Sequence, residues 1–390
     1  MPERRRLVAG CMTGTSLDGL DVALVEIVGS GLDMTATLVA TASRDLGDCG
    51  PRLRDLATNV PMTAGDIARV CRDFGRLHAD VLRGLAGDRR LDLVAIHGQT
   101  VFHRPPVSWQ LIDPWPVVQA LNCPVVTDLR GADLVADGEG APITPLADWV
   151  LFRDATRSRA IVNLGGFCNV TLLPAGDDIA GIRGFDVCVC NQLLDAAARR
   201  ALGEPFDRDG GAAALGEVDD TASSELQQLL LAQRAQDRSL GTDDESLSWL
   251  DAHVDDLAPN DLLATTTHAI GRTIRDVLET KPHAERSVAS DPESSRSDVR
   301  PGPTLRSGLG FDRSEVEVVI AGGGARNAAL VGAMGPTKTT DTFGVPIEAR
   351  EAVAMAILGA LAHDRVPITL PAVTRRQEVV PLPGSWTYPT

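Results

Sequence analysis

A glycine-rich turn near the start of the sequence has the residue types that hold a phosphate tail. Apolar residues at positions 7–12 and 22–27 flank this turn, which predicts a β-hairpin. Gly14 and Gly19 at its tip would let backbone N–H groups approach a ligand closely, because glycine has no side chain. The hydroxyl donors of the turn are Thr13, Thr15 and Ser16. For this hairpin alone, an ordinary polar turn is the alternative interpretation.

Two carboxylates in the same turn, Asp18 and Asp21, indicate a divalent cation. Their negative charges would repel a bare polyphosphate, so they make sense in such a turn only with a cation between them and the phosphates. Lys281 and Lys338 are the only lysines and neither follows a glycine, which excludes a phosphate-binding loop of the GxxxxGK[ST] type. Nucleotide phosphates would therefore be held by backbone amides, hydroxyl groups and metal.

Two further glycine clusters each follow an apolar strand. Residues 160–174 predict a second hairpin, and residues 316–330 predict a strand that runs through glycines into a helix, whose N-terminus could face a sugar or a flat ring. The glycines are Gly165 and Gly166 in the first cluster and Gly322, Gly323 and Gly324 in the second. Two similar hairpins, one in each half of the chain, are what a two-lobed nucleotide clamp would show.

Polar residues at the ends of predicted elements supply the remaining candidates. Residues 91–96 predict a buried strand that delivers His97, Gln99 and Thr100 at its carboxyl end, where ligands collect in open α/β sheets. A hydrogen-bonded structural histidine is the alternative for His97. Asp186 is predicted where a loop turns into a helix, so its carboxylate could cap that helix or act as a general base.

Strands that alternate with helices predict an α/β protein. Apolar residues recur at helical spacing over residues 63–85, with Thr63 as the expected N-cap, and a second helix is predicted at 261–280. A length of 390 residues predicts two domains. Residues 281–315 lack a periodic apolar face and predict a disordered surface insertion, with a partner-binding role as the alternative.

Composition narrows the partners and the compartment. The net charge of −16 argues against nucleic-acid and anionic-membrane partners. No apolar window approaches a membrane span and no secretory h-region follows the first residues, so we expect a cytoplasmic protein. Seven scattered cysteines are typical of a reducing compartment, and Cys168, Cys188 and Cys190 lack the spacing of a metal site.

The ordered motifs closely resemble those of the anhydro-N-acetylmuramic acid kinase family. The motifs are GTSLDGLD at 14–21, HGQTVFHRP at 97–105, NLGGFCNVT at 163–171, GFD followed by Asn at 184–191, and GGGARN at 322–327. Segments at 128–145, 206–210, 351–358 and 371–374 also have counterparts in that family. The resemblance spans essentially the whole chain. It implies an α/β fold of the actin/sugar-kinase superfamily, with two ribonuclease H-like lobes and an interdomain ATP cleft.

The resemblance also implies an activity and a division into lobes. The family uses ATP and water to open the 1,6-anhydro ring of anhydro-N-acetylmuramic acid and to phosphorylate its 6-oxygen, a step of peptidoglycan recycling. The N-terminal lobe would comprise residues 1–130 plus 359–390, and the C-terminal lobe residues 131–358. Family members are often homodimers. A kinase for a different anhydro sugar and a non-catalytic ATP-binding protein remain alternatives.

Site residues follow from the same resemblance. Asp186 matches the family's catalytic carboxylate and would deprotonate the water that attacks the anomeric carbon. ATP and magnesium would be held by Gly14, Thr15, Ser16, Leu17, Asp18, Gly19, Leu20, Asp21, Asn163, Gly165, Gly166, Asn169, Gly322, Gly323, Gly324 and Asn327, with Asp18 and Asp21 at the Mg²⁺. The sugar-side candidates are His97, Gln99, Thr100, Arg130, Asp133 and Glu351. Arg130 suits a lactyl carboxylate, and a structural ion pair with Asp133 is the alternative.

Two departures from the family pattern lie on the expected sugar side. Asp186 is followed by Val-Cys-Val-Cys-Asn, where the family usually has Thr-Gly-Pro-Gly (or Ala)-Asn. β-Branched residues and cysteines do not easily adopt the backbone of a Gly-Pro turn, so a loop of different shape is expected. Glu139 stands where the family has an amide. Both changes raise the possibility of a drifted sugar substrate.

Overall fold

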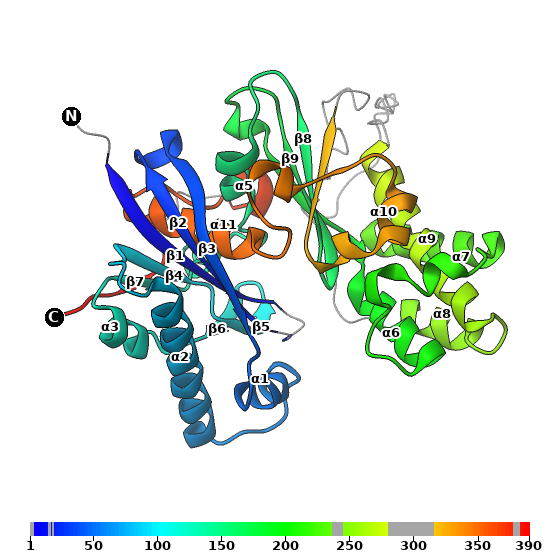
Figure 1. Cartoon of the computed structure of the whole chain (residues 1–390), viewed down its shortest axis with the longest axis horizontal. Helices are drawn as coiled ribbons and strands as arrows, with labels where there is room; N and C mark the ends of the chain where they lie inside the picture. The colour runs from blue at the N-terminus through cyan, green and yellow to red at the C-terminus, as the bar shows by residue number, and fades with distance from the viewer. Residues whose placement is uncertain (1–3, 15–16, 18, 236–244, 280–315, 377–382) are drawn as a thin grey trace, which may run out of the picture.

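The computed structural model describes most of the chain (Figure 1). The described residues are 4–14, 17, 19–235, 245–279, 316–376 and 383–390. Three residues of the first predicted hairpin, Thr15, Ser16 and Asp18, lie outside this part, and so does the predicted insertion at 281–315. Within the described part, no helix has both the length and the apolar character needed to cross a membrane.

A six-stranded sheet contains the first predicted hairpin. Its strands are β1 (Arg5–Thr13), β2 (Leu20–Val28), β3 (Thr35–Arg44), β4 (Leu93–Ile96), β7 (Val125–Thr127) and β13 (Ser385–Thr387). They lie in the order β13-β7-β4-β1-β2-β3. The first three strands are antiparallel neighbours, β4 and β7 run parallel to β1, and β13 is antiparallel to β7. The end of the chain therefore completes the sheet that its beginning forms.

A five-stranded sheet contains the second predicted hairpin. Its strands are β8 (Arg159–Leu164), β9 (Phe167–Leu173), β10 (Arg183–Val189), β11 (Glu317–Ala321) and β12 (Lys338–Thr339), in the order β10-β9-β8-β11-β12. Apart from β13, both sheets thus follow the order third, second, first, fourth, fifth, with the last two strands parallel to the first. This repeated order is the ribonuclease H-like topology. The predicted α/β fold with two such units is confirmed.

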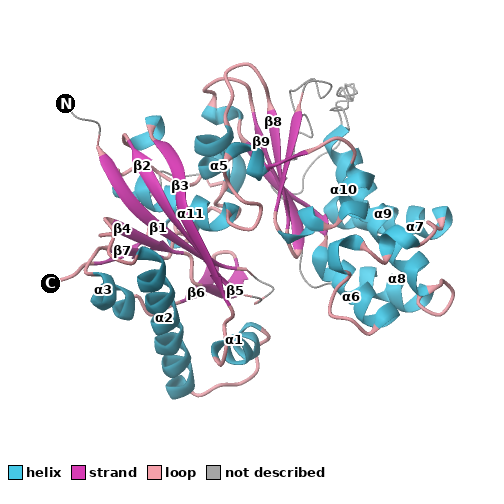
Figure 2. Ribbon diagram, viewed as in Figure 1, coloured by secondary structure: helices cyan, strands magenta, loops and turns pink. Residues whose placement is uncertain are grey.

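Helices surround both sheets, and α5 and α11 lie between them (Figure 2). The α-helices are α1 (Cys49–Ala57), α2 (Ala64–Ala86), α3 (Trp115–Leu121), α4 (Gly131–Leu134), α5 (Pro145–Phe152), α6 (Asn191–Leu202), α7 (Asp220–Ala235), α8 (Glu245–His253), α9 (Pro259–Glu279), α10 (Ala328–Met334), α11 (Arg350–His363) and α12 (Pro371–Thr374). The 3-10 helices include η3 (Arg208–Gly210) and η6 (Gly323–Arg326). A separate hairpin pairs β5 (Gln99–Arg104) with β6 (Val107–Leu111).

Helix α2 begins and ends where its local sequence predicts. The Thr63 side chain accepts a hydrogen bond from the Asp66 backbone N–H, which satisfies one of the free donors at the helix start. Gly87, with a φ of 56°, follows the last helical residue. Val70, Phe74 and other apolar residues of one face are buried against the first sheet. The predicted helix at 63–85 is confirmed.

Helix α11 is buried on nearly all sides in the middle of the molecule. Its residues Ala352 to Ala362 are all buried, as expected for a helix without a polar face. The helix packs so closely on β1 that a Cβ added to Gly10 would lie 2.0 Å from the Ala352 carbonyl oxygen. Its core cluster also includes Ile161 and Val319 of the second sheet. One hydrophobic core therefore joins both sheets.

Candidate active site

The first hairpin forms as predicted between β1 and β2. In its turn the Leu17 N–H donates to the Gly14 carbonyl over 3.2 Å, and Leu17 has a φ of 56°. The side chains of Leu17 and Leu20 are buried in the core, so these residues could meet a phosphate only through their backbone. The Thr13 hydroxyl at the end of β1 is buried and has no hydrogen-bond partner among the described residues. Asp21 lies in β2, opposite Met12.

The second hairpin meets the three-glycine turn. Asn163 and Asn169 face each other across β8 and β9. Gly322 has a φ of +84°, and a Cβ there would lie 2.8 Å from the Leu164 carbonyl oxygen, so the close approach requires glycine. Asn191, the first residue of α6, donates from its side chain to the same carbonyl over 3.0 Å. The second hairpin, the glycine turn and the start of α6 thus form one contact region.

Asn327 has a structural role in the α10 cap. Its side-chain oxygen accepts a hydrogen bond of 2.9 Å from the Leu330 backbone N–H. A Cβ added to Gly210 in η3 would lie 2.2 Å from that oxygen, so the 206–210 segment packs directly on this cap. Helix α10 does not begin directly after the glycines, because Gly323 and Gly324 form the start of η6, which precedes α10.

Arg130 and His97 form the centre of the sugar-side candidates. Arg130 donates to His97 Nε2 from Nε over 3.0 Å and lies 2.9 Å from it through Nη2, and Nη1 donates to the Gly140 carbonyl over 2.9 Å. His97 Nε2 therefore accepts, which places the proton on Nδ1, 2.8 Å from the Gly98 carbonyl. Burial and the charge of Arg130 lower the pKa of His97 to about 3, so the ring is neutral.

Asp186 lies in strand β10 and not in the loop that was predicted. It faces Asn169 of β9, and the pairing then shifts at Val187, so that Cys188 faces Cys168. This β-bulge turns Asp186 and Cys188 to opposite faces, although residues two apart in a regular strand share one face. Asp186 is exposed on its face of the sheet. The prediction failed because a bulge depends on the partner strand.

Two carboxyl groups lie close enough to Arg130 to interact with its charge. Although Asp186 keeps contact with solvent, the protein atoms packed around its carboxyl group raise its pKa above the ordinary value, and the charge of Arg130 opposes that shift. Burial also raises the pKa of Glu351, with a further contribution from Asp21. The two acids in turn offset the effect of burial on Arg130, whose pKa falls to about 10. Arg130, Asp186 and Glu351, from three distant parts of the sequence, therefore lie together.

Glu351 is held beside the second hairpin by the residue before it. Arg350 and Asp148 form a fully buried ion pair between α11 and α5, and Thr171 of β9 donates to the same carboxylate over 2.9 Å. Glu351 itself lies 3.5 Å from the Asn163 side-chain nitrogen. Arg350 and Asp148 carry no local motif, so sequence reasoning missed them.

Asp133 is buried and bound within the chain. Its carboxylate accepts hydrogen bonds from the Gly140 N–H at 2.8 Å and from the Thr374 hydroxyl at 2.7 Å. Instead of forming the suggested ion pair, Asp133 and Arg130 each bind the backbone of Gly140. Asp133 accepts from its N–H, and Arg130 donates to its carbonyl. Glu139 in this loop pairs with Arg375 at 3.2 Å, so its side chain ties the loop to α12.

Gln99 and Thr100 begin strand β5 next to His97. Gln99 donates to the Thr100 carbonyl over 3.2 Å, while its side-chain oxygen is buried without a partner among the described residues. The Thr100 hydroxyl lies 3.5 Å from the Gln110 side chain. A further histidine of the same motif, His103, was not singled out from the sequence, although it lies close enough to Arg130 to lose basicity.

The cysteines behind Asp186 are buried free thiols. Cys168, Cys188 and Cys190 face the core of the second sheet, and burial raises the pKa of each. Such thiols are unreactive, and they do not line the face that carries Asp186. Within the described ranges, no group of three metal-ligating side chains lies together. The cysteine-containing segment that departs from the family pattern therefore lies in the core behind Asp186. It does not lie on the exposed face that carries the Asp186 carboxyl group.

Comparisons with known proteins agree with the motifs. The sequence profile described as "Anhydro-N-acetylmuramic acid kinase" matches residues 6–290 and 309–388, which leaves unmatched a stretch inside the predicted insertion. Proteins of that name are similar over nearly their whole length. The one from Salinibacter ruber is 32% identical, covering 99% of this chain and 97% of that protein. Those from Gloeobacter violaceus and Bordetella pertussis are each 33% identical, covering 96% and 95% of this chain and 97% and 93% of those proteins. This chain belongs to the anhydro-N-acetylmuramic acid kinase family.

Proposed function

We propose that the chain is an ATP-dependent kinase that opens the 1,6-anhydro ring of 1,6-anhydro-N-acetylmuramic acid with water and phosphorylates its O6. The product would be N-acetylmuramic acid 6-phosphate, an intermediate of peptidoglycan recycling. The observation that carries the proposal is the family match along both halves of the chain. The gathering of Arg130, Asp186 and Glu351 from distant segments supports it.

Asp186 would act as the general base. Water is a poor nucleophile, and a positioned base contributes about 10²–10⁴-fold to such a step. The raised pKa of Asp186 increases its basicity, while the charge of Arg130 favours the ionised carboxylate. The proton of the attacking water would pass to Asp186, and the freed 6-oxygen would accept the γ-phosphoryl group.

Arg130 would bind the lactyl carboxylate of the sugar. Its Nη1 and Nη2 atoms carry four N–H bonds, and among the described residues their contacts are with the Gly140 carbonyl and His97. The remaining N–H groups suit a carboxylate, which guanidinium binds strongly. His97 would act by fixing the guanidinium plane. Glu351, Gln99 and Thr100 would complete the sugar side, whereas Asp133 would act through the loop that it anchors.

The two hairpins and the three-glycine turn would hold ATP. Backbone N–H groups around Gly14 and Gly165, with the unpartnered Thr13 hydroxyl, supply the neutral donors that phosphates need. Gly322 lets the three-glycine turn pack against the Leu164 carbonyl, next to the expected adenosine position. Asp18 and Asp21 would hold Mg²⁺, because carboxylate oxygens are ligands that this ion prefers. Bound there, the ion would neutralise phosphate charge.

The proposed lobes are residues 1–130 plus 359–390 and residues 131–358. The pairing of β13 with β7 supports the return of the C-terminal segment to the first lobe. Closure of the lobes would exclude bulk water and limit idle ATP hydrolysis. A cytoplasmic location, assembly as a homodimer and the absence of nucleic-acid partners stay predictions.

A different anhydro sugar is the second candidate substrate, because Glu139 and the Cys188–Cys190 segment depart from the family pattern. The contacts of these residues argue for the family's own sugar. Glu139 pairs with Arg375, and the cysteines are buried in the core. A non-catalytic ATP-binding protein is the other alternative, and the retained Asp186 argues against it.

The proposal is tested by ADP release from Mg·ATP with and without 1,6-anhydro-N-acetylmuramic acid. We expect sugar-stimulated release, with the 6-phosphate identified by mass spectrometry. The matched control is 1,6-anhydro-N-acetylglucosamine, which lacks the lactyl carboxylate and should stimulate far less. ATP binding without stimulation by the first sugar would contradict the proposal, and a panel of other anhydro sugars would then separate the two alternatives.

A further inference from the structure

The β5–β6 hairpin turns its two aromatic side chains outward, and it buries two glutamines together with the apolar Val101 and Leu111. Phe102 and Trp109 face each other across the strands and are 42% and 44% exposed. Gln110, in contrast, is only 9% exposed. Buried polar side chains of this kind need hydrogen-bond partners.

A chain of hydrogen bonds links polar side chains of this hairpin. Gln110 lies 3.5 Å from the Thr100 hydroxyl and donates to the Ser108 hydroxyl over 2.7 Å. Ser108 in turn lies 2.8 Å from His103 Nδ1. The bulge at Val101 brings Thr100 and His103 to one face, although they are three residues apart. These contacts, which begin at Thr100 in the predicted sugar site, thus fix the orientation of the His103 ring.

The far nitrogen of this ring has no partner. His103 Nε2 is buried and makes no hydrogen bond with any residue that the structure describes. Buried polar atoms are nearly always paired, so an unpaired one at a candidate site indicates a ligand atom. Gln99, on the same strand, also has a buried side-chain oxygen without a partner. Two such atoms lie in one short strand next to His97.

The ring is neutral and lies near the site arginine. Burial and the charge of Arg130 lower the pKa of His103 to about 4, and His103 in turn contributes to the low pKa of His97. A neutral imidazole nitrogen is either a donor or an acceptor, according to which nitrogen carries the proton. A hydroxyl group fits both forms, since it donates and accepts. A carboxylate would go to Arg130 instead.

We propose that His103 is a substrate-binding residue whose Nε2 hydrogen-bonds a hydroxyl group of the sugar, with Ser108 and Gln110 as positioning residues. The inference rests on the proposed function, because it assumes that a sugar occupies this face. In 1,6-anhydro-N-acetylmuramic acid the only free alcohol is at C4, since the other ring oxygens are in the anhydro bridge, the ring and the lactyl ether. The 4-hydroxyl is therefore the expected partner.

The test compares His103→Phe and His103→Gln with the wild type in sugar-dependent ADP release. Loss of one buried hydrogen bond in His103→Phe should raise the KM for the sugar about tenfold or more, with the KM for ATP unchanged. His103→Gln keeps a hydrogen-bonding group and should recover part of the loss. Phe102→Ala, on the outward face of the same hairpin, is the matched control and should leave the KM for the sugar unchanged.

A 4-deoxy analogue of the sugar separates a contact from a structural effect. The analogue should bind more weakly than the parent sugar to the wild type, but equally to His103→Phe. An unchanged KM for the sugar in both His103 variants, or an equal penalty for the analogue in wild type and variant, would overturn this inference alone. Absence of any sugar-stimulated turnover in the wild type would instead overturn the proposed function.

Discussion

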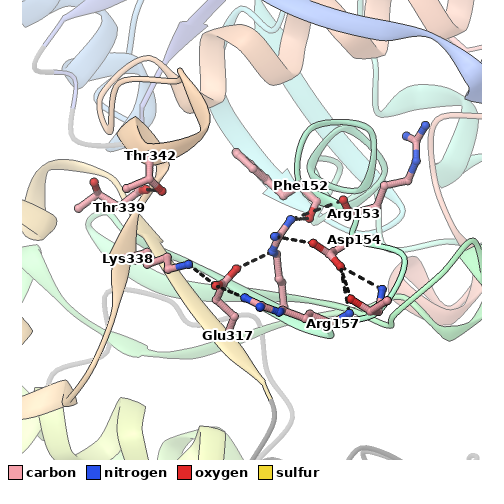
Figure 3. A network of polar contacts seen from close by, with 10 residues as sticks. Phe152, Arg153, Asp154, Arg157, Glu317, Lys338, Thr339 and Thr342 are labelled. Atoms are coloured by element: carbon pink, nitrogen blue, oxygen red, sulfur yellow. Dashed lines mark hydrogen bonds and ion pairs between the residues drawn. The ribbon is translucent and has the colours of Figure 1, made fainter.

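The two ends of the second sheet use charged residues in opposite ways. Where β8 and β11 begin, Arg159 and Glu317 are cross-strand neighbours in a closed network (Figure 3). Arg159 donates to Glu317 at 2.7 Å, to Asp154 at 2.9 Å and to the Phe152 carbonyl at 2.6 Å, and Lys338 also binds Glu317. All three guanidinium nitrogens of Arg159 thus donate hydrogen bonds within the chain.

Where the same two strands end, the chain has no such network of ion pairs among the described residues and continues from β11 into the glycine turn. Asn163 and Ala321 are the last paired residues, and Gly322 follows with its positive φ. Asp186, on β10 in the same sheet, has a raised pKa instead of a lowered one. Groups that satisfy one another stabilise a fold, whereas groups held apart from partners can act on a substrate. The carboxyl end is thus the end where chemistry is expected.

An Asp→Asn substitution at each end of the sheet should give the largest difference in kcat. Asp186→Asn removes the proposed base but keeps its size, so kcat should fall about 10²–10⁴-fold, with the melting temperature nearly unchanged. Asp154→Asn, in the closed network, should leave kcat unchanged. Both variants are measured by sugar-dependent ADP release and thermal unfolding. Equal losses of kcat in the two variants would refute the assignment of roles to the two ends.

The pH dependence should also separate the two ends. A base acts when deprotonated, so kcat/KM should fall about tenfold per pH unit below the raised pKa of Asp186, starting above the ordinary value of about 3.9. At the other end, the hydrogen bond from Lys338 and the contacts with Arg159 lower the pKa of Glu317. That stabilisation is complete above the unfolded pKa of about 4.3 and is lost as pH falls through the lower folded value.

Activity should therefore be lost at a higher pH than the stability due to Glu317. Both pH dependences are measured on samples pre-equilibrated across the same acidic range. ADP release gives the activity, and unfolding in urea gives the stability. If activity and stability are lost over the same pH range, acid unfolding, and not protonation of the base, stops the reaction.

Removal of the central arginine should weaken the fold without changing the chemistry. Arg159→Met leaves Glu317, which is 13% exposed, with fewer partners and leaves the Phe152 carbonyl without its donor. We expect a loss of about 1.5–3 kcal/mol in the free energy of unfolding, measured in urea. The kcat of the folded variant should stay at the wild-type value. A large loss of kcat with unchanged stability would place Arg159 in the functional machinery.

Sequence reasoning succeeded where the signal is local. The Thr63 cap, the two hairpins and the glycines after apolar strands depend on residues a few positions apart, and all appear in the structure. It could not predict that Asp133 binds Thr374, because 241 positions separate them. The bulge that turns Asp186 outward likewise depends on the pairing of β10 with β9. Contacts set by tertiary packing leave no periodic trace in one sequence.

The smallest effect should come from the exposed edge of the closed network. Lys338 is 50% exposed and binds only Glu317 among the contacts described, so solvent screens most of this ion pair. Lys338→Ala should lower the free energy of unfolding by less than about 1 kcal/mol. Arg157→Met is the matched control, since Arg157 is 64% exposed and lies 3.7 Å from the same carboxylate. A loss in Lys338→Ala as large as in Arg159→Met would show that the network acts as one unit, because only coupled charges make an exposed member matter as much as a buried one.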